Sequence, residues 1–211
     1  MAKVKMSIHR ALGELKTYDD RIRSAINSQF IVANKKSNDK INGKTIDETK
    51  SIIQGNFDSV RILIENKKRI KSAVIASNAN TKVMIAGVEY TVADAIERKN
   101  AISLEDDFLR KLRLDFVKEN NKVNSENEQL STKLENYLQS ILGEKSIRQA
   151  SDIEEHTKAF MARNSWELID PNKVEEYIKK LEKDILDFKT EVDYVLSESN
   201  SLTHVEVDLK D

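Results

Sequence analysis

Residues 174–195 read VEEYIKKLEKDILDFKTEVDYV, and this stretch decides the fold. Seven of its apolar residues follow one another at alternating spacings of four and three, and we call them the seam: Val174, Ile178, Leu181, Ile185, Phe188, Val192 and Val195. Such a repeat places one narrow apolar stripe along a helix, and most positions between are Lys, Glu or Asp. A narrow stripe must be covered by another helix, either from the same chain or from a second copy. We expect the 92–142 helix of the same chain to cover it.

The composition also favours long helices. The 211 residues include only 5 Gly and 1 Pro, and aromatic residues make up 6%, which leaves little material for barrels or glycine-lined ligand loops. Charged residues are 34% and hydrophobic residues 39%, a balance that suits an extended helical body with much surface. We therefore predict a single domain over residues 1–211. Its fold class is mainly α: an elongated antiparallel helical bundle or coiled coil with one or two small β-hairpins.

Periodicity and capping residues predict five helices. Their ranges are 8–27 with Ser7 as N-cap, 45–77 with a Thr45–Glu48 capping box, 92–142, 153–164 and 171–197. The 171–197 helix carries the seam, with Asp170 as N-cap and Pro171 as its first residue. The 92–142 helix is polar on all sides over residues 118–129, so this part is either solvent-exposed helix or a loop that interrupts it. A helix stop is expected at Leu142-Gly143.

Two places read as β-hairpins, and the C-terminal tail reads as a strand. Alternating apolar residues around Ala86-Gly87 predict a hairpin over residues 82–91. Residues 29–33 (QFIVA) followed by the turn pair Asn42-Gly43 indicate either a second hairpin or a loop that becomes ordered on a partner. Residues 202–209 (LTHVEVDL) alternate like one more strand.

No motif for catalysis, cofactors or metals emerges from the sequence. Residues 42–45 (NGKT) resemble the end of a phosphate-binding loop, but Asn38 stands where its first glycine is needed, so a turn and helix cap explain them better. The histidines His9, His156 and His204 are far apart, and the adjacent carboxylate pairs point about 100° apart on a helix. We expect a protein that is not an enzyme and uses no cofactor.

The charge pattern gives little support for a nucleic-acid partner. The formal net charge is −1, so no overall field attracts nucleic acid or anionic lipid. Basic runs at residues 67–71 and 110–113 are not interleaved with aromatic residues able to stack on bases, and they read as solvated helix faces. Neither a signal-peptide core nor a run of about 20 apolar residues is present, and there are no cysteines. We expect a protein without a membrane span, cytoplasmic at synthesis.

Four phrases along the chain carry a resemblance. Residues 11–16 (ALGELK), 71–79 (KSAVIASNA), 89–99 (EYTVADAIERK) and 196–200 (LSESN) resemble a family of helical proteins from phages and prophages of Gram-positive bacteria. The hairpin-and-helix unit in the middle third is also similar to septicolysin-like proteins. Neither resemblance implies a catalytic residue. The first implies a phage setting, and hence incorporation into the virion after synthesis.

The expected function is that of a non-enzymatic phage structural or assembly protein, a virion component that acts through helical packing and contacts with other proteins. Its partners would be further copies in a homo-oligomer or other phage structural proteins. The interface candidates are the seven seam residues and Trp166, which lies in a loop and either anchors a partner or plugs the end of its own bundle. The alternative is a regulatory binder or inhibitor of a host protein, which would use residues 118–129 or the loop from 35 to 44.

Overall fold

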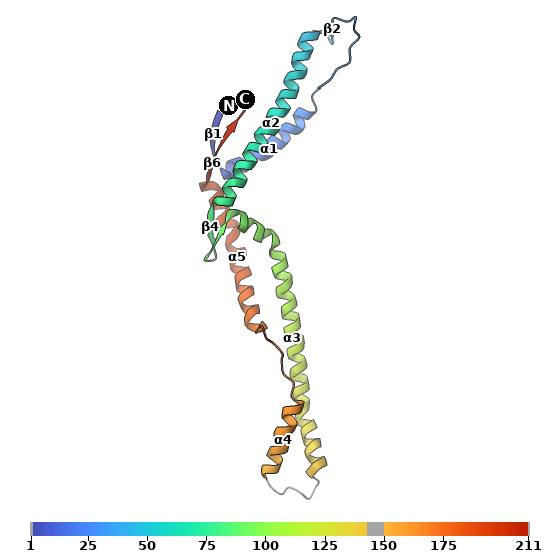
Figure 1. Ribbon diagram of the computed structural model, residues 1–211, viewed down its shortest axis with the longest axis vertical. Coiled ribbons are helices and arrows are strands. Elements are labelled where there is room, and N and C mark those ends of the chain that lie inside the picture. The colour runs from blue at the N-terminus through green and yellow to red at the C-terminus, as the bar shows by residue number, and fades with distance from the viewer. Residues whose placement is uncertain (1, 143–149, 211) are drawn as a thin grey trace. The chain divides into compact units, whose positions relative to one another are not determined.

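A computed structural model describes residues 2–142 and 150–210 of the chain, which form five α-helices and six short strands (Figure 1). The helices are α1 (Ile8–Ile26), α2 (Ile46–Asn80), α3 (Val92–Leu142), α4 (Ala150–Asn164) and α5 (Val174–Leu202). The strands are β1 (Ala2–Ser7), β2 (Lys40–Ile41), β3 (Lys44–Thr45), β4 (Lys82–Ile85), β5 (Val88–Thr91) and β6 (His204–Leu209). The fold is therefore mainly α with small antiparallel strand pairs, as predicted.

The chain divides into two compact units. Unit 1 comprises Met1–Asn100 and Asp187–Asp211, and unit 2 comprises Ala101–Leu186. Helices α3 and α5 each contribute residues to both units. Whether residues 1–211 fold as one domain therefore stays a prediction.

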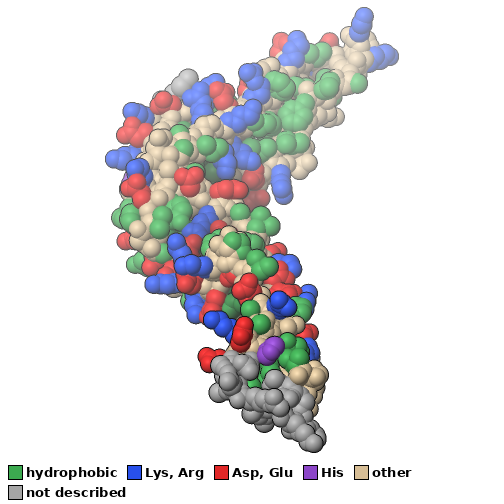
Figure 2. Space-filling model, turned by 60° about the horizontal axis from the view of Figure 1, so that its bottom comes forward, with side chains coloured by type: hydrophobic (Ala, Val, Ile, Leu, Met, Phe, Trp, Pro, Cys, Tyr) green, Lys and Arg blue, Asp and Glu red, His purple; other side chains and the backbone are tan. Residues whose placement is uncertain are grey.

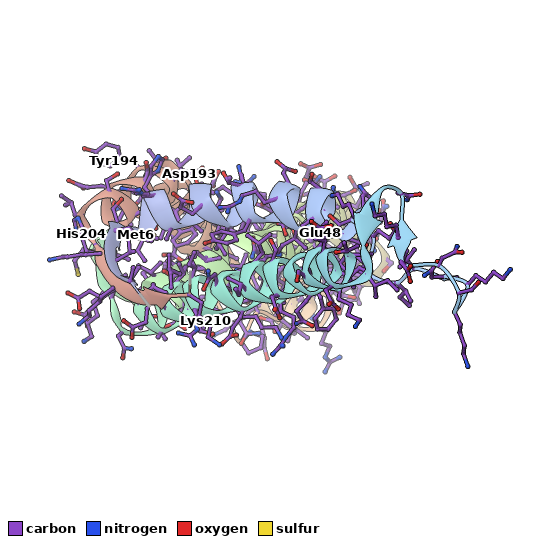
Figure 3. The ribbon with its side chains drawn as sticks, turned by 90° about the horizontal axis from the view of Figure 1, so that it is seen from above. Met6, Glu48, Asp193, Tyr194, His204 and Lys210 are labelled. Atoms are coloured by element: carbon purple, nitrogen blue, oxygen red, sulfur yellow. The ribbon has the colours of Figure 1, made fainter. Side chains whose placement is uncertain are left out.

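The core of unit 1 is built from α1, α2 and the sheet that joins the two ends of the chain. Strand β1 pairs antiparallel with β6, from Ala2 opposite Leu209 to Ser7 opposite His204. Because side chains alternate along a strand, Met6, Val205 and Val207 point into the core and are buried. In Figure 3, Met6, His204 and Lys210 lie toward one end of the α1–α2 pair and Glu48 toward the other.

Local signals fix where three of the helices begin. The Ser7 side chain accepts a hydrogen bond from the Arg10 backbone N–H at 3.2 Å, as an N-cap should. Thr45 and Glu48 form the complete capping box at the start of α2. Thr91 accepts from the Asp94 backbone N–H at 3.0 Å at the start of α3. These predicted helix starts are confirmed.

The predicted hairpin over residues 82–91 is present as β4 and β5. The turn residues Ala86 and Gly87 have φ angles of +51° and +76°, the left-handed pair that matches the twist of a two-residue hairpin. A second, smaller hairpin, β2–β3, turns at Asn42 and Gly43 with φ of +47° and +79°. Residues 29–33 are not a strand, so that part of the prediction is wrong.

Helix α3 runs without a break through residues 118–129, so an interruption there is excluded. One face of this stretch is less exposed than the rest, because Val123 is half-buried and Leu130 is buried. The Asn127 side chain also accepts from the Trp166 N–H and donates to the Trp166 carbonyl, both at 2.9 Å. The polar segment is thus a helix with a chain segment bound to it.

The predicted bounds of the seam helix are wrong at both ends. Helix α5 begins at Val174 instead of Pro171 and extends to Leu202 instead of residue 197. Lys173 adopts φ of +50°, which breaks the helical path between Pro171 and Val174. Asp170 still caps the helix, since its carboxylate accepts from the Val174 N–H at 2.7 Å.

Smaller differences concern the remaining predicted bounds. Helix α2 extends three residues beyond the predicted residue 77, and α4 begins three residues before the predicted residue 153. The tail strand is observed as β6, while β1 was not predicted. The predicted helix stop at Leu142-Gly143 falls partly on Gly143, which lies outside the described residues. Within the described ranges, no helix combines the length and hydropathy needed to cross a lipid bilayer.

Candidate functional site

The seam residues in unit 2 form part of that unit's own core. Ile178 and Ile185 are buried with Leu109 of α3. Further apolar side chains pack around these three from both helices: Ile102, Leu112, Phe116, Val174 and Leu181. The expected covering helix, α3 of the same chain, is therefore the one that packs on this half of the seam.

The seam residues in unit 1 are covered by the β4–β5 hairpin and the first turns of α3. Phe188 is 1% exposed, and its ring meets the Tyr90 ring edge-on with 5.7 Å between centroids. Val192 is buried and Val195 is half-buried. The hairpin is held to α5 at its turn, because the Ala86 N–H donates to the Glu191 carboxylate at 2.6 Å. Ion pairing between Lys99 and Asp193 joins α3 to α5 in the same unit.

Burial changes what these candidates can do. A side chain that fills the core of its own chain stabilises that chain and is not available to a partner. The buried seam residues are therefore structural, and their burial gives no support to an intermolecular seam.

Trp166 is the one candidate with a substantial exposed surface, at 42%. Its indole ring lies 5.0 Å from the Lys122 ammonium group on α3, within the range of a cation–π interaction. Together with the two hydrogen bonds between the Asn127 side chain and the Trp166 backbone, this contact holds Trp166 against α3. Trp166 thus anchors its own loop while part of its surface remains exposed to solvent.

A small apolar surface in unit 2 was not singled out in the sequence. Leu104, Phe108 and Tyr177 are 70%, 49% and 45% exposed, and we call them the aromatic patch. The Phe108 and Tyr177 rings meet edge-on at 6.1 Å, and Leu104 precedes Phe108 by one helical turn. The available signal was the four-residue spacing of Leu104 and Phe108, which places the two side chains on one side of α3.

Polar side chains in the described residues form surface pairs and caps. The pKa of the Glu206 carboxyl is lowered because Lys3 hydrogen-bonds it across the β1–β6 sheet. The pKa of Glu48 is lowered by the hydrogen bonds that it accepts from the Thr45 backbone and side chain. Within the described part of the chain, no group of three or more His, Asp or Glu residues is placed to hold a metal ion. These pairs serve capping and strand pairing.

Comparison with known proteins adds no relative. No protein-family model, no curated protein and no solved structure matches the chain. The function is therefore inferred from the surfaces of the chain itself.

Proposed function

We propose that this chain is a non-enzymatic structural or assembly protein of a phage, which binds further copies of itself or other structural proteins through helix surfaces. The observation that carries the proposal is the aromatic patch of Leu104, Phe108 and Tyr177 in unit 2. The phage setting rests on the sequence resemblance alone.

The aromatic patch has the chemistry of a protein-binding surface. Aromatic side chains contribute a large share of binding free energy in protein interfaces because they bury much apolar area at a small cost in side-chain entropy. Phe108 and Tyr177 hold each other in place through their edge-to-face contact. The two side chains therefore lose little further conformational entropy when a partner covers them. Leu104 extends the same surface by one helical turn, and its side chain is more exposed than either ring.

Figure 2 shows Lys, Arg, Asp and Glu side chains interspersed with hydrophobic ones over the visible face of the molecule. Ion pairs such as Arg113 with Glu182 and Lys111 with Asp115 lie on unit 2. A polar rim around an apolar centre is typical of protein interfaces.

The deciding experiment is mass spectrometry of purified phage particles. The proposal expects the chain at a constant stoichiometry in the particles. A Phe108→Ser variant, supplied in place of the natural chain, should fold normally and be depleted from particles. Leu114→Ser is the matched control, since Leu114 is also exposed on α3 but, six residues after Phe108, points about 120° away from it around the helix.

The other function class predicts a different result. If the chain is found only in infected-cell extract and never in particles, the structural role is wrong. That outcome would favour the regulatory binder of a host protein.

A further inference from the structure

A second surface of the chain, in unit 1 and separate from the aromatic patch, has the features of a helix-binding groove. It lies between α1 and α2 and has a volume of about 640 Å³. Its floor includes Ile22 and Ile64, and its walls are largely basic: Arg23, Lys67, Lys68 and Lys71. The two helices run side by side in Figures 1 and 3.

Each of the two helices carries a second stripe at coiled-coil spacing beside the one that packs in the core. On α1 the stripe is Leu12, Lys16, Asp19, Arg23 and Ile26, and on α2 it is Phe57, Ile64, Lys68, Lys71 and Ile75. All ten residues are exposed, and the apolar ones on α2 are 50%, 37% and 57% exposed for Phe57, Ile64 and Ile75. Two such stripes on neighbouring helices form the groove that a third helix fills in a bundle.

The two stripes lie along the same groove. Lys67 pairs with Asp19, which fixes the register of the antiparallel helices. In antiparallel helices, residues equally far before Asp19 and after Lys67 lie at the same level along the helix axis. Leu12 therefore lies at about the level of Ile75, and Ile26 lies toward the Phe57 end of the groove. Apolar side chains are therefore available at both ends and, with Ile22 and Ile64, in the middle of the groove. Figure 2 shows hydrophobic and basic side chains next to one another over the part of unit 1 that ends in the β2–β3 hairpin.

The charge of the groove is strongly one-sided. Lys16, Arg23, Lys68 and Lys71 form no ion pair with any described residue, although the chain as a whole has a net charge of −1. Asp19, the acidic residue among those that line the groove, is already neutralised by Lys67. Four cations without partners beside an apolar floor select a ligand that is acidic on its flanks and apolar along its centre.

We infer that the groove between α1 and α2 binds an acidic amphipathic helix of another protein. The apolar stripe of that helix would cover Ile22 and Ile64, and its flanking carboxylates would pair with Arg23, Lys68 and Lys71. The distance from Phe57 to Ile75 corresponds to about 27 Å of helix, so the partner helix is about 18 to 20 residues long.

Two other occupants fit the groove less well. A second copy presenting the same face would bring like charges together, which opposes association. Nucleic acid would satisfy the cations, but no aromatic ring lines the groove beside Arg23, Lys68 and Lys71. Phe57, at one end of the α2 stripe, is the single ring among the ten stripe residues, so bases could not stack along the groove and the apolar floor would remain uncovered.

The test uses the full chain and a synthetic helical peptide of 21 residues as probe. The peptide carries Leu at alternating three- and four-residue spacings and Glu or Gln elsewhere, with a fluorescent label for anisotropy titration. The wild-type chain should bind it, and Lys68→Glu with Lys71→Glu should weaken binding at least about tenfold, because rim charges reverse from attractive to repulsive. Ile64→Gln should also weaken binding, since it places a polar group on the floor.

Matched controls separate the groove from general charge effects. Lys35→Glu with Lys36→Glu makes the same charge change in the loop before β2, and it should leave binding within about twofold. A peptide with Lys in place of Glu should not bind. Phe108→Ser should bind the acidic peptide normally, so failure of the proposed function and failure of this inference give different results.

Three outcomes overturn the inference: no binding of the acidic peptide, binding that is insensitive to the reversals at Lys68 and Lys71, or binding that is insensitive to Ile64→Gln. A labelled 20-nucleotide single-stranded DNA serves as the competing probe. If the DNA binds more tightly than the peptide and depends on Lys68 and Lys71 but not on Ile64, the groove is a phosphate-binding surface instead.

Discussion

The guanidinium of Arg98 lies over the ring of Phe188, with its central carbon 4.4 Å from the ring centroid. The same Arg98 donates a hydrogen bond of 2.6 Å to the Tyr90 hydroxyl, and the Tyr90 ring packs edge-on against Phe188. Three elements of unit 1, the β4–β5 hairpin, α3 and α5, thus meet around one buried aromatic ring. The seam residue Phe188 is therefore a structural centre of unit 1.

Phe188→Ala should lower the free energy of unfolding by about 3 to 5 kcal/mol, because a large buried ring leaves a cavity and Arg98 loses its cation–π partner. Urea denaturation followed by circular dichroism measures this change. Tyr194→Ala is the control: Tyr194 lies on the outside of the same helix at 72% exposure, and its loss should cost less than about 0.5 kcal/mol (Figure 3).

The concentration dependence of thermal melting tests whether the seam is covered within one chain. Because the residues that cover the seam belong to the same chain, the melting temperature of the natural chain should not depend on protein concentration. A melting temperature that rises steeply with concentration would instead show that a second copy contributes to the core.

How far the sequence predicts the fold depends on the distance over which each signal acts. The seam, the capping box at Thr45 and the hairpin turn at Ala86-Gly87 are local patterns, and all three are found in the structure. Pairing of β1 with β6 joins residues at opposite ends of the chain, and no local pattern specifies it. The alternation of Val4 and Met6 before Ser7 was the one available hint of β1.

Surfaces are harder to predict than cores for the same reason. A stripe such as Phe57, Ile64 and Ile75 reads as part of an apolar helix face, and only the position of the neighbouring helix shows that it stays uncovered. In the same way, the hydrogen bonds between Trp166 and Asn127 depend on how the chain returns along α3. The sequence therefore identified apolar side chains without separating core from surface.

The Asn66 side chain joins α2 to the residue that follows β6. It is buried in α2, and its side-chain amide donates to the Lys210 carbonyl and accepts from the Lys210 N–H, each at 2.8 Å. Asn66→Ala removes the hydrogen-bond partners of the Lys210 N–H and carbonyl groups, which follow β6. Leaving such backbone groups unsatisfied typically costs about 1 to 3 kcal/mol of stability. Urea denaturation should show this loss, while Asn100→Ala at an exposed helix position should change stability by less than about 0.5 kcal/mol. Equal stability of the two variants would show that the Lys210 contacts contribute nothing.

The continuity of α3 can be tested by hydrogen exchange. Backbone amides of residues 118–129 are bonded within a helix, so they should exchange more slowly than those of residues 30–36, which lie in neither helix nor strand. Mass spectrometry of peptides from the two segments under the same conditions gives the comparison. Equally fast exchange in both segments would contradict a continuous helix and restore the interrupted alternative.

Glu65 should make the stability of unit 1 depend on pH. Its carboxylate accepts hydrogen bonds from Lys210 Nζ at 2.7 Å and from Arg69 Nη2 at 3.0 Å, and these contacts lower its pKa from the ordinary value of 4.5. Because the folded state favours the ionised form, the contribution to stability is fully present above the ordinary pKa and is lost as the pH falls through the lowered folded-state value. Glu65→Gln should therefore be less stable than the natural chain at pH 7, and the difference should shrink as the pH falls below 4.5. Urea denaturation of both proteins between pH 7 and about pH 3 measures it.

Glu128→Gln, at an exposed position of α3 without an ion pair among the described residues, should show no such trend. If the gap between Glu65→Gln and the natural chain stays constant across this range, the pairing of Glu65 with Lys210 and Arg69 does not stabilise the fold.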